Sequence, residues 1–169
     1  GVKPTQLRKD FTSFGHIGKR GLGYDVARLR DKIAQVLGRA QLQPVVIVGV
    51  GNLGAALMAY GGFRREAFEI MGGFDIDVKR QRRKTFAQPI YHLDRLDPFV
   101  RQHHVKMAII TVPPAVAQDV ANRLIAGGVT AILNFAPVVL HVPPNVVVSN
   151  VNLAIELENL SYFRSLAES

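Results

Sequence analysis

The sequence predicts an α/β fold, in which a mainly parallel sheet is covered by helices on both faces. Short runs of apolar and β-branched residues recur along the chain, as expected for strands that are buried on both sides. Helical patterns separate these runs, and that alternation is typical of parallel sheets. A glycine-rich turn directly follows the first apolar run and opens a helix, which is the usual place for a ligand in such sheets.

Each strand is expected where a short apolar run is bounded by turn signals. The predicted strands cover residues 45–48, 68–74, 107–112, 129–135 and 146–149. Helices are expected from residue 52 to about 60, from the segment 92–94 to about 104, and from 113 to 127.

A last helix is expected after the final strand, with Asn150 as its N-terminal cap. Its apolar residues Leu153, Ile155, Leu157 and Phe163 spread over more than one face, which exceeds what a single neighbouring surface can cover. A helix shared with a second surface is therefore favoured, and a helix packed back on its own sheet is the alternative.

The first 40 residues predict a separate element. An amphipathic helix is expected first, because Leu7, Phe11 and Phe14 form one apolar stripe. Four glycines between residues 15 and 23 then favour a tight hairpin with Lys19 and Arg20 at its tip. A second helix is expected to follow this hairpin.

This N-terminal segment carries most of the positive charge. The formal net charge is +8, and residues 1–40 supply +6 of it through nine Lys and Arg against three Asp. A helix followed by a basic hairpin looks like the C-terminal part of a winged helix, which binds DNA through the major groove and through phosphates. A basic appendage with a solvated face is the alternative. The expected DNA-contacting residues are Arg8, Lys9, Ser13, Lys19 and Arg20.

The composition excludes several kinds of chemistry. The chain has no cysteine, which rules out disulfides, thiolate zinc sites and cysteine nucleophiles, and which suits the reducing cytoplasm. Its longest apolar runs are far shorter than the ~20 residues of a membrane span. The five histidines show no metal-ligand spacing, and no residue pattern nominates a proton donor for hydride transfer. We expect no catalytic residue and no metal site.

The glycine-rich turn is Gly49-Val50-Gly51-Asn52-Leu53-Gly54, a G-x-G-x-x-G fingerprint between a strand and a helix. The first glycine allows the tight turn, the second lets the backbone approach a pyrophosphate, and the third lets helix and strand pack closely. The phosphates would lie at the helix N-terminus, where N–H groups and the helix dipole favour an anion. The turn predicts a Rossmann-type domain, and a tight turn without a ligand is the alternative.

Asp75 ends the second strand, 21 residues after Gly54, close to the ~20 expected for the acid that binds the adenosine ribose. Asp77 is the local competitor for this role. A carboxylate at position 75 or 77 disfavours the 2′-phosphate of NADP. A nearby basic cluster could instead accept that phosphate, and it consists of Lys79, Arg80, Arg82, Arg83 and Lys84. We prefer NADH/NAD⁺ as the cofactor.

Two further segments follow neighbouring strands and should line the nicotinamide half of the crevice. They are Thr111-Val112-Pro113 and Asn134-Phe135. The alternative is ordinary loop structure without a ligand.

Three stretches that span nearly the whole chain carry a family resemblance. They are LRKDFTSFGHIGKRGLGYDV (residues 7–26), VVIVGVGNLGAAL with FDID (45–57 and 74–77), and ILNFAPVVLHVP with NVNLAIELENLSYF (132–143 and 150–163). In this order they resemble the Rex family of bacterial redox-sensing transcriptional repressors. Many families share the glycine fingerprint, whereas the first and third stretches are specific.

The resemblance implies a homodimer that binds operator DNA when NADH is low and releases it when NADH binds. It implies three parts along the chain. These are residues 1–40 as part of a winged-helix DNA-binding domain, 41–149 as the Rossmann NAD(H)-binding domain, and 150–169 as a dimerisation helix that swaps into the partner.

The sequence departs from the family pattern in three ways. Family members have two helices before the recognition helix, so the resemblance implies an N-terminally truncated member. The family's tyrosine in the recognition helix is Ser13 here, and its aspartate at the head of the swapped helix is Asn152. An amide cannot form a charged pair, so the redox switch is expected to be weaker or differently wired.

Two other classes of function are compatible with the fingerprint. One is a small NAD-dependent oxidoreductase, which would transfer hydride and have no affinity for an operator. The other is a coenzyme-A-binding module with a similar fold and turn. Asp75 argues against coenzyme A, because that cofactor carries a 3′-phosphate on the ribose.

Overall fold

The computed structural model describes residues 18–19, 23–26, 42–78 and 86–167, which fall into two compact units, Gly1–Gln43 and Pro44–Ser169. In the first unit, strand β1 (Gly18–Lys19) pairs antiparallel with strand β2 (Gly23–Tyr24). This pairing confirms the predicted hairpin. Arg20, the helix with Arg8, Lys9 and Ser13, and the helix after the hairpin lie outside the described residues, apart from Asp25 and Val26.

The second unit is built on one six-stranded sheet with the strand order β5-β4-β3-β6-β7-β8. The strands are β3 (Gln43–Val48), β4 (Phe68–Asp75), β5 (Ile90–His92), β6 (Met107–Ile110), β7 (Ala131–Asn134) and β8 (Val147–Asn150). The described pairings β3–β6, β4–β5, β6–β7 and β7–β8 are all parallel. The strand order reverses between β3 and β6, which is where open α/β sheets bind ligands.

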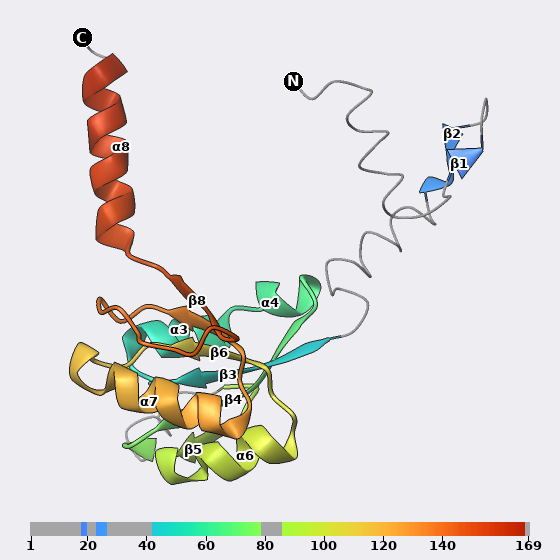
Figure 1. Ribbon diagram of the computed structural model, residues 1–169, viewed down its shortest axis with the longest axis vertical. Coiled ribbons are helices and arrows are strands. Elements are labelled where there is room, and N and C mark those ends of the chain that lie inside the picture. Colours follow the sequence, from blue (N-terminus) through green and yellow to red (C-terminus); the bar gives the residue numbers. More distant parts are fainter. Residues whose placement is uncertain (1–17, 20–22, 27–41, 79–85, 168–169) are drawn as a thin grey trace. The chain divides into compact units, whose positions relative to one another are not determined.

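Helices cover both faces of this sheet (Figure 1). They are α3 (Asn52–Ala59), α4 (Gly62–Arg65), the 3₁₀ helix η1 (Leu93–Arg95), α6 (Leu96–Gln102) and α7 (Pro114–Gly127), whereas α8 (Leu153–Ala167) follows β8 and does not pack on the sheet. Successive residues of β3 alternate between two cores, because strand side chains point to opposite faces. Val46 and Val48 pack in the cluster that holds residues of α6 and α7, whereas Val45 and Ile47 pack with α3. The predicted α/β class is confirmed.

One strand and one helix cap differ from the prediction. No strand was expected before His92, but β5 lies there and forms the sheet edge beside β4. Asn150 does not cap the last helix, because it is the final residue of β8. The cap is Asn152, whose Oδ1 accepts hydrogen bonds from the N–H groups of Ala154 and Ile155 at 3.0 and 3.4 Å. An aspartate at this position could supply the same oxygen, so the amide keeps the helix start intact.

Helix α8 exposes its apolar side chains to solvent in the single chain. Its described residues, from Leu153 to Leu166, are all exposed. At 100° per residue, these side chains form two opposite stripes. One stripe holds Leu153, Leu157 and Leu160, and the other holds Ile155, Tyr162 and Leu166. Two separate surfaces are needed to cover them.

Within the described part of the chain, none of the helices is long and apolar enough to span a membrane.

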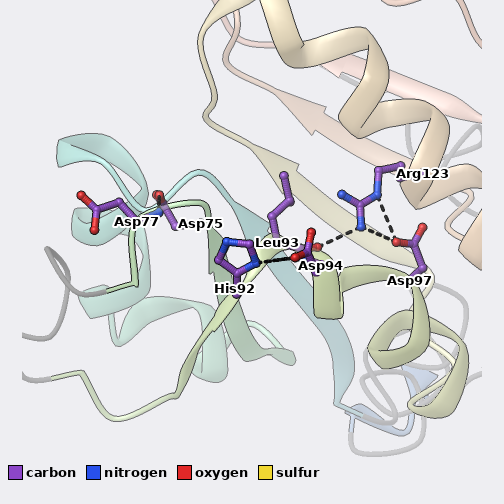
Figure 2. Close-up of polar contacts among 7 residues, drawn as sticks. All are labelled: Asp75, Asp77, His92, Leu93, Asp94, Asp97 and Arg123. Atoms are coloured by element: carbon purple, nitrogen blue, oxygen red, sulfur yellow. Dashed lines mark hydrogen bonds and ion pairs between the residues drawn. The ribbon is translucent and has the colours of Figure 1, made fainter.

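One ion pair joins Arg123 on α7 to Asp97 on α6 (Figure 2). Arg123 donates Nε–H to Asp97 Oδ2 at 3.0 Å and Nη2–H to the Leu93 carbonyl at 2.9 Å, and its Nη2 also contacts Asp97 Oδ2. The hydrogen bond from Arg123 lowers the pKa of the Asp97 carboxyl below its usual 3.8, although partial burial opposes the shift.

Replacing Arg123 by Met should therefore destabilise the fold in a pH-dependent way. Because the pKa of Asp97 is lower in the folded state, the pair stabilises fully above pH 3.8 and this stabilisation is lost as the pH falls through the folded-state pKa. Both side chains are about one third exposed, so the loss at neutral pH should be about 1 kcal/mol. Urea unfolding at pH 7 and at low pH measures it, with the exposed Arg95→Met as control. An equal loss at both pH values would contradict this account.

Candidate functional site

The glycine-rich turn is packed so tightly that two of its glycines are required. Gly49 has a φ of +91°, and a Cβ there would lie 2.7 Å from the Thr111 carbonyl oxygen. A Cβ on Gly54 would lie 1.9 Å from the Gly49 carbonyl oxygen, because α3 begins directly against the end of β3. The first and third glycines of the fingerprint thus serve the turn and the packing of helix on strand, as predicted.

Gly51, the second glycine, faces open space. A Cβ added there meets no atom within 4 Å, and the backbone φ of −68° is one that any residue can adopt. The fold therefore does not require glycine at this position. Gly51 is also the N-cap of α3 and provides no side-chain cap, so the first N–H groups of the helix point to this space. The turn forms a cradle that a Cβ would fill, and it matches a bound phosphate group.

Asp75 is held against this turn by two backbone hydrogen bonds. Its Oδ2 accepts from the Val50 N–H at 2.7 Å, and its Oδ1 accepts from the Asp77 N–H at 2.9 Å. Figure 2 shows Asp75 at the end of β4, with Asp77 beyond it. Each carboxylate oxygen keeps a further lone pair for a hydroxyl donor. Asp75, rather than Asp77, is joined to the fingerprint, and its geometry fits a ribose diol beside the phosphate cradle.

Thr111 fixes the other side of the turn. Its Oγ1 donates to the Gly49 carbonyl at 2.5 Å and lies 3.2 Å from the Val48 carbonyl. The Thr111 N–H donates to Val48 O at 2.9 Å, which extends the β3–β6 pairing by one residue. Val112 is half-buried, and Pro113 is the exposed N-cap residue of α7. The structure thus brings this predicted segment next to Gly49.

Asn134 ends β7 beside this segment but is wholly buried, with 0% of its surface exposed. Its Nδ2 donates to Ala136 O, Val138 O and Asn150 Oδ1, and its Oδ1 accepts from the Ala136 N–H. Both amide hydrogens are therefore used inside the protein. Phe135 is half-buried and packs on the α3 side of the sheet. The structure brings both predicted residues to the carboxyl edge, where the Asn134 side chain organises the protein itself.

His92 is a site neighbour that the sequence did not indicate. It ends β5 opposite Asp75 in the parallel register, and its Nδ1 lies 3.0 Å from Asp94 Oδ2 (Figure 2). The short run Ile90-Tyr91 before it was the available signal. Among the residues that the structure describes, no group of three or more acidic or histidine side chains could hold a metal ion.

Comparison with known proteins identifies the family. The family model described as CoA binding domain matches residues 40–138, which is more than half of the chain. The redox-sensing transcriptional repressor Rex of Carboxydothermus hydrogenoformans is 46% identical over 96% of this chain and 78% of its own length. The Rex repressor of Streptomyces coelicolor is also 46% identical, and there the match spans 63% of that protein.

This chain belongs to the Rex family of redox-sensing transcriptional repressors. Solved structures agree with the assignment. The structure of RSP, titled as a complex with β-NAD⁺ and operator DNA, superposes with a TM-score of 0.86 at 32% identity, over 99% of this chain and 77% of that one. RSP in complex with β-NADH gives a TM-score of 0.80 at 31% identity, over 99% and 78% of the two chains.

Gly54, the third glycine of the fingerprint, gives a prediction for the stability of this Rex-family chain. Gly54→Ala should destabilise the domain by about 3 kcal/mol or more, because the methyl group would collide with a backbone carbonyl that cannot rotate away. Thermal or urea unfolding measures the loss. Gly61→Ala is the matched control, since a Cβ at Gly61 meets nothing within 4 Å. Equal stability of the two variants would show that α3 does not pack on β3 as described.

Proposed function

We propose that this chain is a transcriptional repressor that binds NAD(H) at the carboxyl edge of its sheet and releases operator DNA when NADH binds. The observation that carries the proposal is the hydrogen bond between Asp75 and the Val50 N–H, at 2.7 Å. This bond joins the carboxylate that would accept the ribose hydroxyls to the turn that would hold the phosphates. One dinucleotide carries both groups, so it could bind both at once. The Rex relatives and the RSP complexes support the same cofactor.

Each part of the cofactor has a matching group in the chain. The N–H groups of Asn52 and Leu53, in the first turn of α3, would hold the phosphates above Gly51. The Val50 N–H is engaged by Asp75 and so orients the carboxylate for the ribose hydroxyls. The nicotinamide half of the cofactor would be lined by Thr111-Val112-Pro113 and by Phe135. Asn134 would fix the loop that contains Phe135 through its hydrogen bond to the Ala136 carbonyl.

The basic N-terminal part, residues 1–40, would contact the operator as part of a winged helix. Arg8, Lys9 and Ser13 would act from the recognition helix, and Lys19 and Arg20 from the hairpin. Lys and Arg contacts to phosphate make affinity fall steeply with salt. The +6 net charge of this segment supports the assignment.

The C-terminal segment, residues 150–169 with helix α8, would join two copies of the chain. The two opposite apolar stripes of α8 need two surfaces, and a helix exchanged between identical partners meets that need. NADH then acts by shifting the population of dimers, because it binds the arrangement that does not fit DNA more tightly than the one that does. The proposed mechanism needs no catalytic step, and it requires the protein to meet operator DNA in the cytoplasm.

Calorimetric titration of the chain with NADH and NAD⁺ tests the cofactor assignment, with operator binding measured in parallel with and without NADH. We expect tighter binding of NADH than of NAD⁺, no consumption of NADH, and weaker operator binding once NADH is present. Equal affinities for the two redox forms would contradict sensing, because a ligand shifts an equilibrium only through differential affinity.

The same titration separates two other functions. Coenzyme A is included because the matching family model is named for it. Tighter binding of coenzyme A than of NADH would indicate a coenzyme-A module, although the Asp75 carboxylate opposes a ribose 3′-phosphate. Oxidation of NADH by an added carbonyl substrate would indicate an oxidoreductase.

A further inference from the structure

The Asn134 side chain connects three segments at the carboxyl edge of the sheet. Its Nδ2 donates at 3.0 Å to the carbonyls of Ala136 and Val138, in the loop after β7. The same Nδ2 donates at 2.9 Å to Oδ1 of Asn150, the last residue of β8. Because Asn134 itself is wholly buried, its amide would be costly to leave without hydrogen-bond partners.

The Asn150 end of this contact leads directly into α8. The Val151 N–H donates to the Asn134 carbonyl at 2.8 Å, so side chain and backbone of Asn134 both hold the exit from β8. Asn152 follows as the helix cap, and α8 begins at Leu153. Only two residues separate the Asn134–Asn150 bond from the first residue of α8.

The other end of the contact leads to the nucleotide site. The Phe135 N–H donates to the Ile110 carbonyl at 2.9 Å, which ties the end of β7 to the end of β6. Thr111 follows Ile110, and its Oγ1 is bonded to the Gly49 carbonyl in the phosphate turn. Hydrogen bonds therefore run across the ends of four neighbouring strands, from the cradle to the start of α8.

We propose that the Asn134–Asn150 amide pair couples the nucleotide site to α8, with both residues as positioning residues rather than ligands. The inference rests on the proposed function, since it needs NADH at the cradle. A ligand that moves the loop after β7 also moves the Ala136 and Val138 carbonyls that Asn134 holds. The amide then shifts against Asn150, and the direction in which α8 leaves the sheet changes with it.

Asn150 offers the clean test, because its side chain is exposed and its removal leaves the other bonds of Asn134 in place. Asn150→Ala removes the acceptor. Asn150→Asp keeps an oxygen that accepts the Asn134 Nδ2–H, and so serves as rescue. Asn122→Ala is the matched control, since it removes an exposed amide acceptor of the same kind, bonded to Gln118 at 2.9 Å on α7.

The absence of cysteine allows one unique spin label on α8, through Ser161→Cys in each variant. Pulsed EPR measures the distance between the two labels of the dimer with and without NADH, and calorimetry on the same samples gives NADH affinity. We expect NADH to shift the distance in the labelled parent and in Asn122→Ala. Asn150→Ala should lose most of this shift while its NADH affinity stays close to that of the parent, and Asn150→Asp should restore it.

Several results would overturn the inference. A full shift in Asn150→Ala would show that the amide pair transmits nothing. Loss of NADH affinity in Asn150→Ala would assign the pair to ligand binding instead of coupling. A parent that binds NADH without any shift would remove α8 as the responding element and leave the proposed cofactor intact. A parent that fails to bind NADH would refute the proposed function, and calorimetry alone reveals that outcome.

Discussion

Replacing Gly51 by Val should reduce NADH affinity on the order of 100-fold, as expected when two hydrogen bonds to a charged group are lost. The side chain would occupy the open space beside the first turn of α3 and keep phosphate away from its N–H groups. The fold should tolerate the change. The backbone of Gly51 is extended, with a φ of −68° and a ψ of −155°, and the poorer helix cap costs about 1 kcal/mol. Calorimetric titration with NADH and thermal unfolding measure the two effects separately.

Gly61→Val is a closely matched control for this experiment. Gly61 is also a glycine N-cap, of α4, with a negative φ and no atom within 4 Å of an added Cβ. It should lose the same small amount of stability and retain NADH affinity. Unchanged affinity in Gly51→Val would show that the phosphates do not lie on this turn. Equal losses of affinity in both variants would point to a general effect on the domain.

Leu157→Asp combined with Leu160→Asp should convert the proposed dimer to monomers. Both side chains belong to one apolar stripe of α8 and are 67% and 66% exposed in the single chain. Burial of a leucine side chain contributes at least about 1.5 kcal/mol, so two positions in two copies amount to about 6 kcal/mol, or roughly four orders of magnitude in the dimer dissociation constant. Burial of the new carboxylates would increase the loss. Sedimentation equilibrium measures it.

Ser161→Asp with Ser165→Asp controls for the added charge, because these residues form a polar strip on the same helix. That variant should remain dimeric. If Leu157→Asp with Leu160→Asp also remained dimeric, the partner surface would lie elsewhere and the exchange of α8 would be refuted. Circular dichroism on both variants establishes that α8 stays helical.

The positions of the glycine-rich turn and of Asp75 could be predicted from sequence, because a strand–turn–helix spacing and the end of a strand are visible in the local pattern. The spacing of Gly49, Gly51 and Gly54 follows from a turn between one strand and one helix, and the structure gives each glycine the expected surroundings. Asp75 was predicted from its distance along the chain and from its position at a strand end. The apolar character of α8 was equally visible, because helical periodicity alone shows that two faces are apolar.

Only the tertiary structure decided which residues meet across strand ends. Asn150 was predicted as a helix cap, and it instead accepts a hydrogen bond from Asn134, 16 residues earlier. Thr111 lies 62 residues from Gly49 yet bonds to its carbonyl. His92 faces Asp75 because of the register of β4 and β5. The pattern of apolar and polar residues along a chain determines its turns and the apolar faces of its helices and strands. The register between strands determines which side chains meet at the strand ends. That register arises only when the whole sheet has assembled.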